Sequence, residues 1–196
     1  FGNQPWSRNV HDLDSTQLIA AVRTMREEGR ILDSDDQLTG KPEIFIGAAV
    51  NPFSDPVEYR PLHMRKKVEA GADFVQTQCI FDMDRFRNFM SIVSDMGLDR
   101  ETFVLAGVTP LKSAAMARYM ANRVPGIIIP DEIIRRMEMV PKDKAAEEGI
   151  RICCEQIEIL REIQGVKGIH IMAIEWEHRV GEIVERAGLY PRPEII

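Results

Sequence analysis

The chain has 196 residues, 44% hydrophobic and 29% charged, which is the composition of an ordinary globular protein that can bury a sizeable core. Its formal net charge of -6 argues against broad nucleic-acid affinity, which needs clustered lysine and arginine. No run approaches the ~20 apolar residues of a membrane span and no segment resembles a signal peptide. We therefore expect one cytoplasmic domain over residues 1–196, with no membrane and no nucleic-acid partner.

The first third of the chain predicts a helix, a strand and a second helix. Asp14 or Ser15 is a suitable N-cap for the first helix, and Leu18 opens its apolar stripe. The continuously apolar run Ile44–Val50 predicts a short strand that is covered on both faces. A proline-rich loop follows, and then a helix over Pro61–Ala70.

The rest of the chain repeats this alternation. Strands are predicted over Asp73–Thr77, Thr102–Ala106 and Val166–Ile174, and helices over Phe81–Met96, Lys112–Asn122, Asp131–Met139, Lys144–Ile163 and Glu177–Ala187. Alternating strands and helices predict a parallel α/β sheet. Four strands cannot close a (β/α)8 barrel, and the G-x-G-x-x-G turn of many doubly wound sheets is absent. A truncated TIM barrel that begins with the helix after strand four fits both facts.

The most informative segment is Lys66–Gln78. It reads as the end of a basic helix, a glycine turn, a buried strand and then polar side chains at the carboxyl end of that strand. In barrels of alternating strands and helices, ligands bind at this end of the strands. Because the chain opens at Phe1 without a methionine, we expect part of the working site to lie upstream.

Cysteine and histidine give no sign of a metal centre. The cysteines are Cys79, Cys153 and Cys154, and the adjacent pair would point to different sides of a helix, so we expect reduced thiols in or near a core. No two of the 4 histidines have a metal-ligand spacing, and we predict no metal. His170, inside the last predicted strand, is expected to be a core histidine facing the barrel interior.

Several segments together resemble one family. They are Val10–Asp14, Lys66–Gln78, Phe81-Asp82, Gly107–Pro110, Ile129-Pro130 and Gly165–His170. In this order and spacing they resemble the C-terminal half of the methylenetetrahydrofolate reductase family, the flavin-dependent enzymes of one-carbon metabolism. The resemblance spans essentially the whole chain.

The resemblance implies a (β/α)8 barrel that holds FAD at the carboxyl ends of its strands. A reduced nicotinamide, or another electron donor, reduces the flavin, and the flavin N5 passes hydride to the methylene carbon of the folate to give 5-methyltetrahydrofolate. The glutamate that serves as general acid would precede Phe1, so no catalytic residue is named here. We expect the natural protein to be longer by roughly 100 residues, the size of four βα units, and this part alone to be inactive and prone to associate.

Position by position, the resemblance assigns ligand contacts. Gln78 matches a glutamine that faces the pterin and the nicotinamide, and an amide can both donate to and accept from a pterin edge. Lys67 matches a lysine that reaches the phosphate or ribose of FAD. His11 and Asp12 lie where the family's chain passes the flavin.

Other positions depart from the family. Val50 and Asn51 stand where many members place Tyr-Pro against the flavin. Met116 replaces a residue that can touch folate or nicotinamide, and Trp176 stands near an arginine for the substrate's tail, where its ring could stack on p-aminobenzoate. These departures indicate a divergent branch that takes electrons from a partner subunit.

Two other functions remain open on the sequence. A pterin- or corrinoid-dependent methyl-transferring barrel would use the same strand ends without FAD. A non-catalytic barrel subunit of a reductase complex would keep the fold and lose the chemistry. We also expect an oligomer or a complex with an electron-transfer partner.

Overall fold

A computed structural model of the chain describes residues 12–32, 34 and 36–191. The strands are β1 (Gly47–Val50), β2 (Phe74–Cys79), β3 (Phe103–Val108) and β4 (Val166–Ile171). The helices are α1 (Ser15–Glu28), η1 (Val57–Tyr59), α2 (Arg60–Ala70), α3 (Met83–Asp95), α4 (Leu98–Glu101), α5 (Ala114–Arg123), α6 (Asp131–Met139), α7 (Ala145–Arg161), η2 (Glu177–Arg179) and α8 (Val180–Arg186). Within the described ranges, no helix combines the length and the apolar character that crossing a membrane requires.

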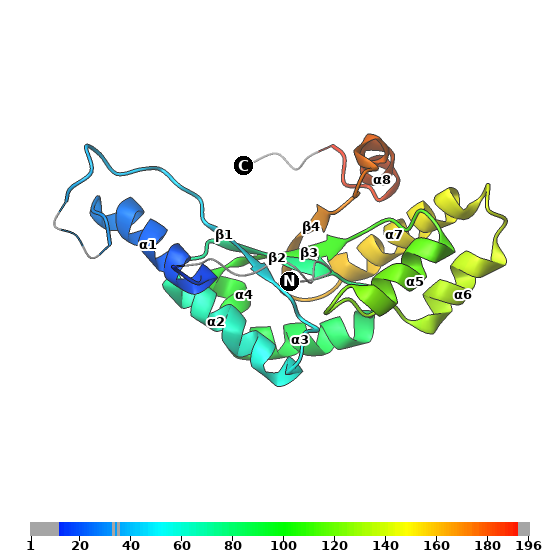
Figure 1. Cartoon of the computed structure of the whole chain (residues 1–196), viewed down its shortest axis with the longest axis horizontal. Helices are drawn as coiled ribbons and strands as arrows, with labels where there is room; N and C mark the ends of the chain where they lie inside the picture. Colours follow the sequence, from blue (N-terminus) through cyan, green and yellow to red (C-terminus); the bar gives the residue numbers. More distant parts are fainter. Residues whose placement is uncertain (1–11, 33, 35, 192–196) are drawn as a thin grey trace.

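The four strands form one parallel sheet in the order β1-β2-β3-β4. Each strand lies beside the next strand of the chain, and helices α2, α3, α5 and α6 lie on the same side of the sheet (Figure 1). A doubly wound sheet would reverse its strand order and place helices on both faces. The parallel α/β prediction is confirmed, and the winding is of the single-direction kind.

One face of the sheet packs against the helices and forms the main core. Val75 and Val104 are fully buried there, and so are Ile150 and Ile157 of α7. Ile169 of β4 packs against the same cluster. Side chains alternate along a strand, so the intervening residues point to the other face.

That second face, called the open face below, has no helix over it in the described part of the chain. At the amino ends of the strands it carries three aromatic side chains. Phe45 stacks on Phe74 with ring centroids 5.3 Å apart, and lies 6.3 Å from Phe103. Phe45 is 64% exposed and Phe103 53% exposed, although parallel sheets are normally covered on both faces.

On the open face, side chains of neighbouring strands fill the space over the small residues. An added Cβ at Gly47 would lie 2.3 Å from Cζ of Phe74, and one at Gly168 would lie 2.8 Å from Cδ2 of Leu105. Large side chains of one strand thus lie over small residues of the next, as in the interior layers of a barrel.

The predicted caps set the helix ends. Asp14 accepts from the backbone N–H of Gln17 at 2.8 Å, and the Gln17 side chain accepts from the Asp14 N–H, which is a complete capping box for α1. Gly71 ends α2 in the left-handed conformation, with φ of 119°.

Two expectations about the first third are wrong. The apolar run Ile44–Val50 becomes a strand only from Gly47. Within the described ranges the helices cover one face of this strand, so its cover on both faces stays a prediction. Leu18 is 55% exposed, whereas Ile19 is buried. Helix α1 packs on α2, and its Ile19 also lies in a cluster with Ile46 and Ala72. This docking selects a face about one residue away from the predicted stripe.

Candidate functional site

The carboxyl ends of β2, β3 and β4 bring Gln78, Gly107 and His170 to one edge of the open face. Gly107 pairs in register with His170, and, beyond a bulge in β2, with Cys79. The residues on either side of His170 show which face its side chain is on, since Ile169 and Ile171 pack into the helix-side core. His170 therefore points to the open face, as the sequence predicted, and it is half-buried there.

The hydroxyl of Thr77 holds the bulge that presents Gln78. It accepts the backbone N–H of Gly107 at 2.8 Å and donates to the carbonyl of Gln78 at 2.9 Å. Thr77 is buried, whereas the amide of Gln78 is exposed and has no hydrogen-bond partner within the described ranges. The bulge thus fixes the backbone and leaves the amide free for a ligand.

Lys67 is a buried cation on the face of α2 that meets β1. It is 6% exposed, and its Nζ donates to the carbonyl of Ala49 at 2.7 Å. No carboxylate of the described chain forms an ion pair with it. Burial lowers the pKa of the Lys67 amino group, and the more distant charge of Asp14 opposes that change. A buried cation without a carboxylate partner is suited to an anionic ligand.

Further cations lie near Lys67 on α2. The ring of His63 stacks on Tyr59 with centroids 6.0 Å apart, and Nζ of Lys66 donates to the Tyr59 hydroxyl at 2.9 Å. Desolvation, followed by the charges of Lys67, Arg60 and Lys66, lowers the pKa of His63. Sequence reasoning missed His63 and Lys66. The available signal was their spacing, since His63 stands four residues before Lys67 on one helix face.

The sequence as a whole now decides which family this site belongs to. It matches the family profile described as Methylenetetrahydrofolate reductase over residues 3–188. The chain belongs to the methylenetetrahydrofolate reductase family.

Curated members of the reductase family match most of this chain at low identity. A probable methylenetetrahydrofolate reductase (NADPH) of Caenorhabditis elegans is 24% identical over 195 residues, which cover 96% of this chain and 27% of that protein. Methylenetetrahydrofolate reductase 2 of Schizosaccharomyces pombe is 28% identical over 155 residues, 76% of this chain and 24% of that protein. The 5,10-methylenetetrahydrofolate reductase of Salmonella typhimurium is 24% identical, over 82% of this chain and 52% of that protein. The chain thus spans about half of the bacterial relative and about a quarter of the two eukaryotic ones.

Among the solved structures with a similar fold is one from Clostridium thermocellum. It is titled "Uncharacterized protein from Clostridium thermocellum binds two copies of 5-methyl-5,6,7,8-tetrahydrofolic acid". The two chains superpose with a TM-score of 0.52 at 15% identity, over 85% of this chain and 67% of that one.

The other predicted contacts of the reductase family lie in several places. Asp12 is exposed, and it precedes Asp14, whose charge acts on Lys67. His11 lies outside the described residues. Val50 is buried in the helix-side core, so its side chain points away from the open face.

Asn51 and Met116 are engaged in packing. Oδ1 of Asn51 accepts the backbone N–H of Phe53 at 3.0 Å, and Nδ2 lies 2.1 Å from where a Cβ on Gly126 would be. Met116 is half-buried against a second core cluster that includes Leu111. The assignment of both to ligand contact stays a prediction.

Trp176 follows β4 and lies between two cations. Nζ of Lys112 is 6.0 Å from the centre of its ring, and the guanidinium of Arg179 is 5.4 Å away. Glu175 beside it has a φ of 52°, a conformation that non-glycine residues rarely adopt. The half-buried indole lies in the loop at the carboxyl end of β4 and packs against the helix-side core. Both cations are paired with carboxylates, Lys112 with Glu175 at 4.0 Å and Arg179 with Glu182 at 2.7 Å.

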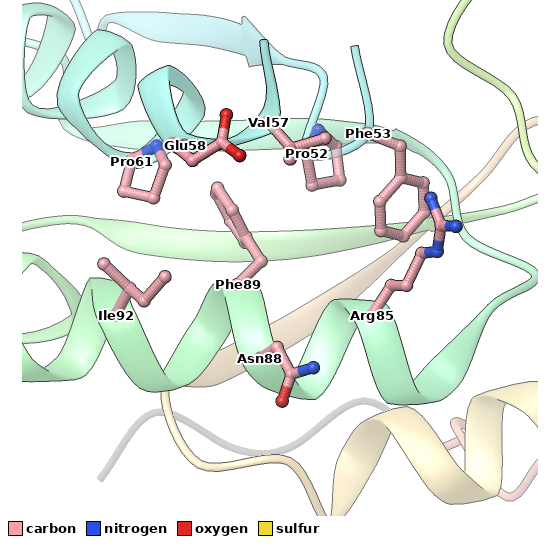
Figure 2. A pocket seen from close by; sticks show the side chains of 9 residues that line it. All are labelled: Pro52, Phe53, Val57, Glu58, Pro61, Arg85, Asn88, Phe89 and Ile92. Carbon is pink, nitrogen blue, oxygen red and sulfur yellow. The ribbon is translucent and has the colours of Figure 1, made fainter. Parts of the chain in front are cut away.

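A separate apolar groove lies on the helix side of the sheet. Figure 2 shows its lining, which comes from the loop after β1, from η1, from the start of α2 and from α3, and its cavity volume is about 370 Å³. The lining residues are Pro52, Phe53, Val57, Glu58, Pro61, Arg85, Asn88, Phe89 and Ile92. The groove contains none of the residues predicted from the sequence to bind a ligand, and we do not assign it to the site at the strand ends.

The cysteines are all buried free thiols. Sγ of Cys79 lies 2.8 Å from the hydroxyl oxygen of Thr109. Burial raises the pKa of Cys153 to about 12. Among the described residues, no three His, Cys, Asp or Glu side chains are grouped so that they could hold a metal ion.

Proposed function

We propose that this chain forms the C-terminal half of a (β/α)8 barrel and carries part of the active site of a flavin-dependent methylenetetrahydrofolate reductase. The observation that carries the proposal is the exposed amide of Gln78 beside Gly107 at the strand ends, in a member of this family. Ligands of such barrels bind at this edge.

The open face is the part of the chain that requires further barrel strands. β1 and β4 are the outer strands of the sheet, and the aromatic side chains of Phe45 and Phe103 are more than half exposed. Further parallel strands beside β1 and β4 would bury those rings and pair both edges. The winding order and the layered filling of Gly47 and Gly168 support this closure.

FAD fits the charges of α2. Lys67 is buried without an acidic partner, and His63 and Lys66 lie on the same helix, so this face can hold a pyrophosphate. Asp12 and His11, before α1, and the loop after Val50 are assigned to the flavin on the family's pattern. When bound, the flavin supplies the hydride that converts the methylene group to a methyl group.

The substrate contacts are assigned to Gln78, Met116 and Trp176. The Gln78 amide can donate to and accept from the pterin edge and so set which face of the pterin meets the flavin. The Trp176 ring can stack on p-aminobenzoate, beside Lys112 and Arg179, which are paired with Glu175 and Glu182. The electron donor is a reduced nicotinamide or a partner subunit, and the working protein is cytoplasmic.

The test uses the protein at its full natural length, anaerobically, with 5,10-methylenetetrahydrofolate and one of three donors: NADH, NADPH or a chemically reduced viologen. Formation of 5-methyltetrahydrofolate, measured by mass spectrometry, is the expected result. Turnover with the viologen alone would identify a partner-fed enzyme. Absence of product with every donor would contradict the proposal.

A matched pair of variants ties the activity to the strand end. Gln78→Leu removes the amide, and kcat/KM should fall by about 10- to 100-fold, the value of one or two lost hydrogen bonds. Gln76→Leu is the control, because Gln76 lies on the same strand before the bulge, in register with Leu105, and should change kcat/KM by less than about threefold. Equal effects of the two variants would contradict the assignment of Gln78.

A further inference from the structure

His170 is a half-buried imidazole that the fold leaves without a partner. It lies on the open face of β4, one pair from the end of the strand, in register with Gly107. Within residues 12–32, 34 and 36–191, neither of its ring nitrogens takes part in a hydrogen bond. A satisfied core histidine would show such a bond, since buried polar groups are nearly always paired.

The strand between His170 and Gln78 has no side chain at this level. Gly107 of β3 pairs in register with His170 and, beyond the bulge, with Cys79. Gln78 lies in that bulge, one residue before Cys79, so the amide and the imidazole stand at the carboxyl ends of strands that are two spacings apart, about 9.5 Å. Met172 and the backbone carbonyls of Thr77 and Gln78 cover the glycine, because an added Cβ at Gly107 would lie 2.7 Å from Cε of Met172 and 2.8 Å from the Gln78 oxygen. The resulting floor contains the thioether of Met172, whose Sδ lies 4.0 Å from Sγ of Cys79, and such sulfur atoms pack well against flat rings.

This arrangement matches one class of ligand. A planar nitrogen heterocycle with an amide-like edge presents flat faces to Met172 and alternating donors and acceptors to Gln78 and His170. A charged ligand fits less well, since Leu105 and Gly168 fill the next row of this face and contribute no charge.

We propose that His170 is a ligand-contacting residue that hydrogen-bonds the edge of a planar heterocycle lying on Met172, opposite Gln78. The inference rests on the proposed function, in which the flavin ring and the pterin ring are both heterocycles of this kind. It gives His170 a role in binding, in place of the core role expected from the sequence.

The experiment measures two dissociation constants on the protein at its full natural length, one for FAD by flavin fluorescence and one for 5-methyltetrahydrofolate by calorimetry. His170→Ala should weaken one of the two by about 10-fold, the value of one lost hydrogen bond. Loss for FAD assigns the flavin ring to this floor, and loss for the folate assigns the pterin. The control is Lys167→Ala, an exposed residue of the same strand, which should change neither constant.

Two conservative variants separate contact from structure. In His170→Asn the amide lies near the place of Nδ1, and in His170→Gln near the place of Nε2, so the variant that restores binding identifies the bonding nitrogen. If His170→Ala does not fold, these two variants carry the comparison, and restoration by one of them is the expected result.

Three outcomes would overturn the inference: both constants of His170→Ala match those of Lys167→Ala; neither amide variant restores binding; or the loss of binding follows only the loss of thermal stability. If the unaltered protein binds neither ligand, the proposed function fails as well. If the unaltered protein binds and the variants bind equally, only the assignment of His170 fails.

Discussion

Replacing Lys67 with methionine separates a cofactor contact from a structural one. Methionine keeps most of the volume of the buried side chain and removes its charge. The folded protein loses the hydrogen bond from Nζ to the carbonyl of Ala49, at 2.7 Å, and also loses the cost of burying an ammonium group without an acidic partner.

The two contributions to stability oppose each other. A hydrogen bond from a charged donor contributes about 1.5 to 3 kcal/mol, and the relief from desolvation is of similar size. We expect the free energy of unfolding of Lys67→Met to stay within about 1 kcal/mol of the original value, a shift in Tm of roughly 4 °C at most. The affinity for FAD should fall by about 10- to 100-fold, because one charge-assisted contact to the pyrophosphate is lost.

The pH dependence gives an independent check. Burial lowers the pKa of Lys67 in the folded chain, so between that pKa and the ordinary value of 10.5 the unfolded chain binds more protons. The free energy of unfolding should therefore rise with pH in that window, and Lys67→Met should remove this part of the rise.

The assay compares Tm without cofactor and the FAD dissociation constant by fluorescence. Arg65→Met is the matched control, since the exposed Arg65 on the same helix pairs with Glu69 at 3.5 Å and should affect neither quantity. The reasoning is refuted if Lys67→Met lowers stability by several kcal/mol and leaves FAD affinity unchanged.

The remaining predictions concern stability and protonation. Glu148→Ala removes a buried carboxylate that bridges two arginines, and should lower the free energy of unfolding by about 2 to 3 kcal/mol in urea titrations. The control Asp131→Ala, in an exposed ion pair at 3.9 Å, should change the same free energy by less than about 0.5 kcal/mol. Gly149→Ala should destabilise strongly, because its Cβ would lie 1.7 Å from a backbone oxygen, while Gly181→Ala in open helix should raise Tm slightly; equal effects would refute the packing argument. The NMR titration midpoint of His63 should lie below 6.5 and rise when FAD binds, and acid should lower stability as pH falls from about 6.5 through that midpoint, since the unfolded chain protonates first. A midpoint above 6.5 would contradict the cationic environment.

The strand and helix order followed from the sequence because hydrophobic period and caps are local properties. Asp14, Gly71 and the apolar run of β2 each act within a few residues, and the structure places their elements within about three residues of the prediction. The residue pattern placed Gln78 at the carboxyl end of its strand, and the structure has it one residue before the end of β2.

Side-chain direction could not be predicted as well. Val50 ends β1 as expected, yet it points into the helix-side core, because the strand register decides its face and that register depends on pairing with β2. Leu18 and Ile19 differ by one helix position, and the docking of α1 chooses between them. Gly107 has no side chain, and Met172 fills part of the space over it. This contact joins residues 65 positions apart, so no local pattern in the sequence predicts it.

The buried cation of α2 was only partly predictable from the sequence. Lys67 reads as one of three consecutive basic residues, a pattern most common on solvated helix faces. Its burial arises from the packing of α2 against β1, and the stacking of His63 on Tyr59 needs the turn η1 before the helix.

The most direct test of the account is an anaerobic absorption spectrum of the protein at its full natural length, before and after addition of 5-methyltetrahydrofolate. The account predicts bound oxidised flavin that is bleached by the methyl-folate, which runs the reaction in reverse. A protein purified without flavin that also fails to bind added FAD would contradict it, and a bound flavin that stays oxidised would contradict the assignment of the folate.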